Sequence, residues 1–132
     1  MMRKLNILIP AALEAVSRNL VENGKVASEY NGYIASFGAT IKQCGLPITV
    51  MMFAGSTRSK NEKLKLLKAI WEIINQDDGT PYQSNPNTFL NYVKEYFGNR
   101  NNPTNDPVLQ YRAERAAIAL KLAIRTFPQD KN

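Results

Sequence analysis

One run of apolar residues at helical spacing constrains the fold of this chain more than any other feature. Tyr30, Ile34, Phe37, Ile41 and Cys44 are separated by four, three, four and three residues. That spacing places all five side chains on one stripe of an α-helix, with the apolar cysteine as the last member. The run therefore predicts a helix that buries one face in a core.

The residues on either side of this run are those that helix ends prefer. Ser28 is a potential N-cap, and Glu29 is an acid in the first turn. Gly45 follows the last apolar position, and Pro47 stands two residues later, where it can stop one helix and open another. We therefore expect a helix from Glu29 to Cys44.

Small side chains interrupt the interior of this expected helix. Gly32 and Gly38 lie inside it, together with Ala35 and Ala39. Each glycine costs the helix about 1 kcal/mol relative to alanine. Two such costs in one helix indicate that another backbone packs closely against this surface.

Two neighbouring segments are also expected to be helical. A stripe of apolar residues predicts a helix from about Asn6 to Glu22, which Asn23 and Gly24 end. Pro10 either kinks this helix or marks the start of its regular part. Residues 46–54 are almost wholly apolar and suit a buried strand or a short buried helix. Because no other segment offers a convincing partner strand, we interpret them as a helix.

The rest of the chain continues the helical pattern. A helix from Asn61 to Asn75 is apolar round most of its circumference, which indicates packing on several sides. Two further helices begin with a cap residue and a proline, at Asn85-Pro86 and Asp106-Pro107, and end near Gly98 and Phe127. The sequence thus predicts an all-α fold, a single-domain bundle of about six helices over residues 1–132.

The composition excludes several classes of protein. Apolar residues make up 44% of the chain, too many for a disordered protein. No apolar run reaches the roughly 18 to 20 residues that span a membrane, and Pro10 and Glu14 interrupt the only patch resembling a signal peptide. A single cysteine permits no internal disulfide, which agrees with a reducing cytoplasm.

The residues also give little support for catalysis. The chain has no histidine, so Ser-His-Asp and Cys-His arrangements and ordinary zinc sites are excluded. Asp77 and Asp78 lack a third acid at a useful spacing and are interpreted as a solvated turn. We predict no catalytic residue, no metal site and no cofactor.

Basic residues point instead to a polyanionic partner. Seventeen Lys and Arg against eleven Asp and Glu give a net charge of +6, which favours RNA or DNA over a membrane. Basic side chains gather between Arg58 and Lys68, although such a face can also be merely solubilising. Aromatic residues do not alternate with them, so base stacking is not expected. The candidate RNA-binding residues are Arg18, Lys42, Lys60, Lys65, Arg112, Arg115, Lys121 and Arg125.

Several short motifs stand out in the first part of the chain: IPAALEAV at 9–16, GKV at 24–26, EYNGYI at 29–34, SFGATI at 36–41, Gln43 and Gly45-Leu46. Together they resemble a known family, the small subunit of Cmr-type (type III-B) CRISPR effector complexes. The resemblance covers most of the chain, although residues 56–105 match only in general character. The last helix, which carries Lys121 and Arg125, is similar too.

This resemblance implies an all-α, cytoplasmic protein without enzymatic activity of its own. The implied partners are CRISPR guide RNA and target RNA, the backbone subunits, the large Cas10-type subunit and neighbouring copies of the chain itself. A basic face would line the channel that holds the guide–target duplex, and another subunit would cut the target. Such a protein contributes shape and charge, while base pairing supplies sequence specificity.

The motif around the second expected helix is assigned to the core and to subunit contact. The residues with this assignment are Tyr30, Tyr33, Phe37, Gly38, Ile41, Gln43, Gly45 and Leu46.

Two other functions remain open: a helical protein–protein adaptor without RNA contact, and a DNA-binding helical module, although no helix-turn-helix pair stands out. An enzyme is the least expected class.

Overall fold

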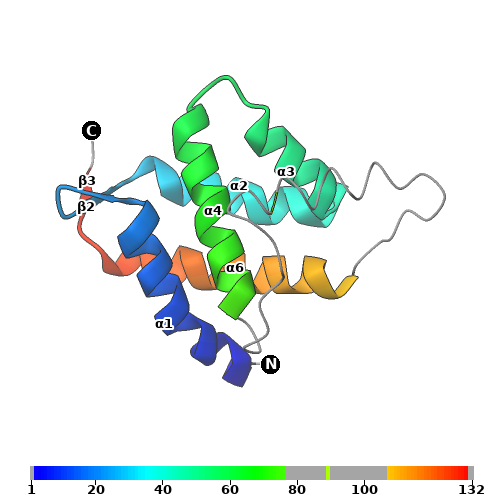
Figure 1. Ribbon diagram of the computed structural model, residues 1–132, viewed down its shortest axis with the longest axis horizontal. Helices are drawn as coiled ribbons and strands as arrows, with labels where there is room; N and C mark the ends of the chain where they lie inside the picture. Colours follow the sequence, from blue (N-terminus) through cyan, green and yellow to red (C-terminus); the bar gives the residue numbers. More distant parts are fainter. Residues whose placement is uncertain (1, 77–88, 90–106, 131–132) are drawn as a thin grey trace.

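The computed structural model describes residues 2–76, 89 and 107–130, and these residues are mostly helical (Figure 1). The described part contains five helices, so the all-α prediction fits broadly although about six helices were expected. The helix expected from Asn85 to Gly98 lies outside the described residues, except for Phe89. The elements are α1 (Met2–Asn19), β1 (Val21–Glu22), β2 (Lys25–Ala27), α2 (Glu29–Cys44), α3 (Leu46–Ala54), α4 (Lys60–Gln76), α6 (Pro107–Thr126) and β3 (Gln129–Asp130).

The first helix differs from its prediction at both ends. It runs from Met2 straight through Pro10, so the regular part of the helix does not begin at the proline. It also ends at Asn19 rather than at Glu22. The Asn19 side chain there donates a hydrogen bond to the carbonyl of Ala15 over 2.9 Å, which satisfies one carbonyl of the last turn.

A small three-stranded sheet, which the sequence analysis did not predict, follows α1. Strands β1 and β2 form an antiparallel hairpin, with φ of 54° at Asn23 and 77° at Gly24. Positive φ at both central residues is typical of the two-residue turn that matches strand twist, and Asn-Gly is its preferred sequence. Strand β3 pairs in parallel with β2, and Val26 donates a hydrogen bond to the carbonyl of Pro128 over 2.9 Å. The sheet therefore ties the chain after α6 to the loop before α2.

Helix α2 has the expected bounds, but the Ser28 side chain does not contribute to its start. Ser28 stands at the N-cap position as expected, but it has α-helical backbone angles and its side chain makes no capping hydrogen bond. Gly45 has a φ of 83°, and its N–H donates to the carbonyl of Ile41 over 2.8 Å. Thr49 then donates to the carbonyl of Gly45 over 2.7 Å, and α3 begins at Leu46, which confirms the helix chosen there.

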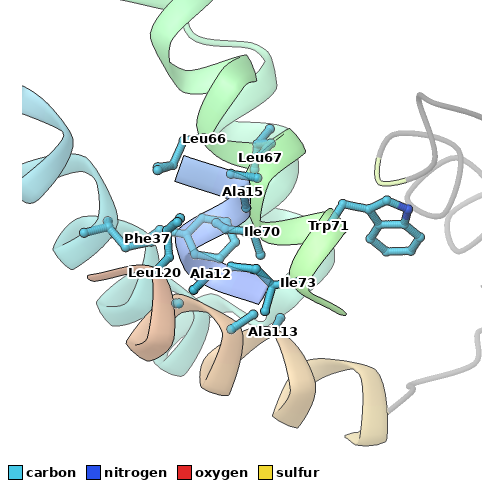
Figure 2. Close-up of a cluster of buried hydrophobic side chains, with 14 of the residues drawn as sticks. Ala12, Ala15, Phe37, Leu66, Leu67, Ile70, Trp71, Ile73, Ala113 and Leu120 are labelled. Atoms are coloured by element: carbon cyan, nitrogen blue, oxygen red, sulfur yellow. The ribbon is translucent and has the colours of Figure 1, made fainter. Parts of the chain in front are cut away.

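The core forms where α4 crosses α6 with α1 and α2 beside it (Figures 1 and 2). Small residues of α1 and α6 let the helices approach closely, and larger apolar side chains of α4 fill the centre. The rings of Phe37 and Phe53 meet edge to face at 5.3 Å, joining α2 to α3. Central residues drawn in Figure 2 include Ala12, Ala15, Phe37, Leu66, Ile70, Ile73, Ala113 and Leu120.

Helices α2 and α6 run antiparallel, and two hydrogen bonds fix their register. Asn31 near the start of α2 donates to Gln129 just beyond α6 over 2.9 Å. At the opposite end, Leu46 donates its backbone N–H to Gln110 over 3.3 Å. Helix α4 crosses α6 in the view of Figure 1.

Candidate nucleic-acid interface

The last helix carries two of the predicted basic residues on one exposed edge. Pro107 is the first residue of α6, where its missing N–H costs no helical hydrogen bond. Lys121 and Arg125 are four residues apart, so both lie on the same edge. Arg125 is exposed in the last turn, where the helix dipole favours a cation, and Lys121 is half-buried. In the described part of the chain, neither forms an ion pair with a carboxylate.

The outer face of α6 is apolar beside this basic edge. Tyr111, Ile118 and Leu122 are 41%, 48% and 42% exposed. Their spacing of seven and four residues places them on one face of the helix, and the structure turns that face to solvent. Basic and large apolar groups therefore share the same exposed surface of α6.

Two of the predicted RNA contacts are already paired within the chain. Arg18 of α1 lies 3.2 Å from a carboxylate oxygen of Glu72 on α4. Lys65 of α4 lies 3.2 Å from a carboxylate oxygen of Glu22 on β1. Both pairs are largely exposed, and exposed pairs contribute little stability. Their charges are nevertheless partly neutralised, so they are weaker candidates for phosphate contact.

Arg112 and Arg115 occupy the other edge of α6. Arg115 is only 8% exposed, and its guanidinium lies 5.2 Å from the centre of the Tyr111 ring. A side chain held in this way cannot reach a phosphate without leaving its place in the fold. Arg112 is half-buried. Both arginines are therefore weaker candidates for phosphate contact than Lys121 and Arg125.

The two remaining candidates are exposed at helix ends. Lys42 lies in the last turn of α2, next to the exposed Gln43. Lys60 is the first residue of α4. The structure thus leaves four accessible candidates: Lys42 at the end of α2, Lys60 at the start of α4, and Lys121 and Arg125 on α6.

The motif residues of α2 divide between the interior and the surface. Gly38, Tyr33 and Gly45 are half-buried, and Gln43 is exposed. Cys44, the last member of the predicted apolar stripe, is exposed as well, so its assignment to the buried face is wrong. The buried residues of the motif are Tyr30, Phe37, Ile41 and Leu46.

The expected close approach of a second backbone to α2 does not occur within the described part of the chain. A Cβ atom added at Gly32 or at Gly38 would meet nothing within 4 Å. Ala35 and Ala39 are exposed. The small residues of α2 therefore form an open surface, and packing among the described residues accounts for neither glycine.

A network around Lys63 is the feature that sequence reasoning missed. The Lys63 ammonium donates a hydrogen bond to Ser56 over 2.9 Å and lies 5.5 Å from the centre of the Tyr33 ring. The only signal in the sequence was the density of polar residues between α3 and α4. Such density does not distinguish a lysine used within the protein from one that faces solvent.

No metal site or membrane-spanning helix is found in the described ranges. Residues 2–76, 89 and 107–130 contain no group of three histidine, cysteine or acidic residues that could hold a metal ion. None of the helices described there is both long and apolar enough to cross a bilayer. Asp77 and Asp78, weighed above as a cation site, lie outside the described residues.

Comparison with known proteins places the chain in a family. No curated protein and no solved structure matches it. A family model described as CRISPR-associated protein (Cas_Cmr5) matches residues 9–99. The match spans more than half of the chain and includes most of α1, the hairpin and the whole of α2 to α4. The chain therefore belongs to the Cas_Cmr5 family of CRISPR-associated proteins.

Proposed function

We propose that this protein is a non-catalytic small subunit of a type III-B CRISPR ribonucleoprotein that binds the RNA backbone. In this role it contacts guide and target RNA in the cytoplasm and packs against backbone subunits, the large Cas10-type subunit and other copies of itself. Membership of the Cas_Cmr5 family supports the link to CRISPR defence. The basic surface supports the contact with RNA.

The single observation that carries the RNA contact is the pair of cations on α6. Lys121 and Arg125 share one edge of the helix, and neither is neutralised by a carboxylate in the described part of the chain. Lys42 is exposed in the last turn of α2, toward the opposite end of α6 from this pair, and would be a separate contact. Cations arranged in this way neutralise phosphates without reading bases, which suits an RNA whose sequence is read by pairing.

The salt dependence of RNA binding tests this proposal. We expect the K121Q/R125Q variant to bind a short RNA duplex more weakly than the wild type. The slope of log affinity against log salt concentration should fall by about one unit for each phosphate that the variant no longer neutralises. Fluorescence anisotropy at several salt concentrations measures both quantities, and circular dichroism checks that helical content is unchanged.

The matched control is K25Q/K68Q, which removes the same charge from two exposed lysines of β2 and α4. It should lower affinity through the general field of the protein but leave the slope close to that of the wild type. Equal slopes for both double variants would contradict a specific role for the α6 pair.

A protein–protein adaptor without RNA contact is the second candidate, and exposed apolar side chains favour it. Ile48, Met51 and Met52 of α3 are 40%, 49% and 56% exposed, and Ile48 lies about one helical turn before each of the two methionines. Contiguous apolar surface of this kind marks contact with another protein. An adaptor would bind its partner subunits with equal affinity in the presence and absence of RNA.

A further inference from the structure

The loop between α3 and α4 is held more tightly than its polar sequence suggests. Residues 55–59 form it, at an edge of the molecule (Figure 1). Ser59 has a φ of 55°, a left-handed conformation that side chains other than glycine adopt infrequently. Such a conformation persists only where the surrounding contacts fix it.

Lys63 is the first of these contacts. Its ammonium donates to the hydroxyl of Ser56 over 2.9 Å and lies 5.5 Å and 5.8 Å from the ring centres of Tyr33 and Phe53. A cation at this distance from two aromatic rings is attracted by both. Lys63 therefore uses its charge inside the protein, between α2, α3 and α4.

The network continues to both sides of Arg58. Ser56 donates its hydroxyl proton to the carbonyl of Arg58 over 2.8 Å. On the other side, the Tyr33 hydroxyl donates to the Ser59 hydroxyl over 2.7 Å, and the backbone N–H of Lys63 donates to the carbonyl of Ser59 over 3.0 Å. The backbone before and after Arg58 is thus fixed by groups from two helices.

Two basic side chains lie on this loop and at the start of α4. Arg58 and Lys60 are both exposed, and no ion pair joins either of them to a carboxylate in the described residues. Glu62 is the acid of the first turn of α4 and is half-buried. Arg58 on the loop and Lys60 at the start of α4 are therefore two exposed cations beside a backbone whose conformation is fixed by Lys63 and Tyr33.

We propose that Lys63 and Tyr33 are positioning residues that hold this loop so that Arg58 and Lys60 contact an RNA phosphate. The inference rests on the proposed function, and it adds a second contact separate from Lys121 and Arg125. Lys63 itself does not touch the phosphate. Replacing Lys63 would weaken RNA binding because the loop would become less ordered.

Y33F is the most informative variant because it removes one hydrogen bond without changing the net charge. We expect faster amide hydrogen exchange at residues 56–60 and about 2- to 10-fold weaker binding to a short RNA duplex. K63M should show both effects more strongly. Its control, K68M, removes an equal charge from an exposed lysine of the same helix and should leave the exchange of the loop unchanged.

A double-mutant cycle separates positioning from a general loss of structure. In the R58Q/K60Q background, Y33F should have no further effect on RNA affinity, because the groups that it positions are gone. If Y33F weakens binding equally in both backgrounds, the proposal is overturned.

The exchange measurement also separates this inference from the proposed function. If the wild type binds no RNA, the proposed function fails and the phosphate contact of the loop fails with it. Faster exchange in Y33F and K63M would then still support the positioning of the loop. Unchanged exchange in both variants would overturn the positioning, whatever the RNA measurements show.

Discussion

At the scale of single residues, Gly32 inside α2 and Gly45 at its end differ in what a side chain at each position would cost. Gly45 combines a φ of 83° with a ψ of 165°, a region that side chains rarely enter, although the nearest atom to an added Cβ lies 3.7 Å away. Gly32 lies in a helix interior with open space beside it. Backbone conformation therefore constrains Gly45, whereas Gly32 is merely unfavourable for the helix.

This contrast gives a prediction for the isolated chain. Gly45→Ala should lower the free energy of unfolding by about 1–3 kcal/mol through backbone strain. Gly32→Ala should raise it by about 0.5–1 kcal/mol, because alanine favours the helix and meets no neighbour. Urea denaturation measures both changes. If Gly32→Ala destabilised the chain, the surface of α2 would not be open as described.

The buried Tyr30 predicts a dependence of stability on pH. Burial, assisted by the negative charges of Glu62, Glu22 and Glu29, raises the pKa of Tyr30 to about 12 from 10.0. The folded state therefore retains the phenol proton at pH values where the unfolded state has released it. The resulting stabilisation, on the order of 2 kcal/mol, is complete below pH 10 and is lost as the pH rises toward 12.

The variant Tyr30→Phe isolates this effect from the lysines, which titrate in the same range. Denaturation at about pH 8 to 12 should show a steeper loss of stability in the wild type than in the variant. Parallel curves for the two proteins would mean that Tyr30 titrates alike in the folded and unfolded states.

At the scale of elements, periodicity and end signals predicted α2, α3, α4 and α6 to within a few residues. The small sheet was not predicted, because its strands have only two or three residues and no period can show in them. The Asn-Gly turn was the available signal, but it was interpreted as a helix end. The partner strand β3 lies about a hundred residues away, beyond the reach of local patterns.

Burial was also harder to predict than helical bounds. Apolar residues on α3 and α6 have the pattern of core residues, yet Met52 and Ile118 are about half exposed. The sequence specifies the period of a helix, but the number of its faces that find a partner depends on the tertiary arrangement. Cys44 was assigned to the core for the same reason.

The different packing of α4 and α3 leads to a prediction about stability. Ile70→Ala should lower the free energy of unfolding by about 2–5 kcal/mol, because this residue of α4 is completely buried. Met52→Ala on the exposed side of α3 should change it by less than about 0.5 kcal/mol. Thermal unfolding followed by circular dichroism compares the two. Similar losses of stability would show that the outer face of α3 is covered.

For the molecule as a whole, the sequence could suggest a chemistry for the candidate site but could not give its geometry. The net charge pointed to a polyanionic partner, the lack of histidine excluded several kinds of catalytic site, and the motifs between residues 9 and 46 led to the family. The pairing of Arg18 with Glu72, and of Lys65 with Glu22, joins residues more than forty positions apart. Such pairs follow from the packing of α1, α4 and the hairpin, which no local pattern specifies.

The proposed role requires that this subunit bind RNA that other molecules select and cut. Affinity purification of the protein from its native cells, followed by sequencing of bound RNA and mass spectrometry of bound proteins, is the decisive experiment. We expect small CRISPR RNAs to be recovered together with companion subunits of the effector complex, and less RNA to be recovered with K121Q/R125Q. Recovery of the protein without CRISPR RNA and without such subunits would refute the proposed role.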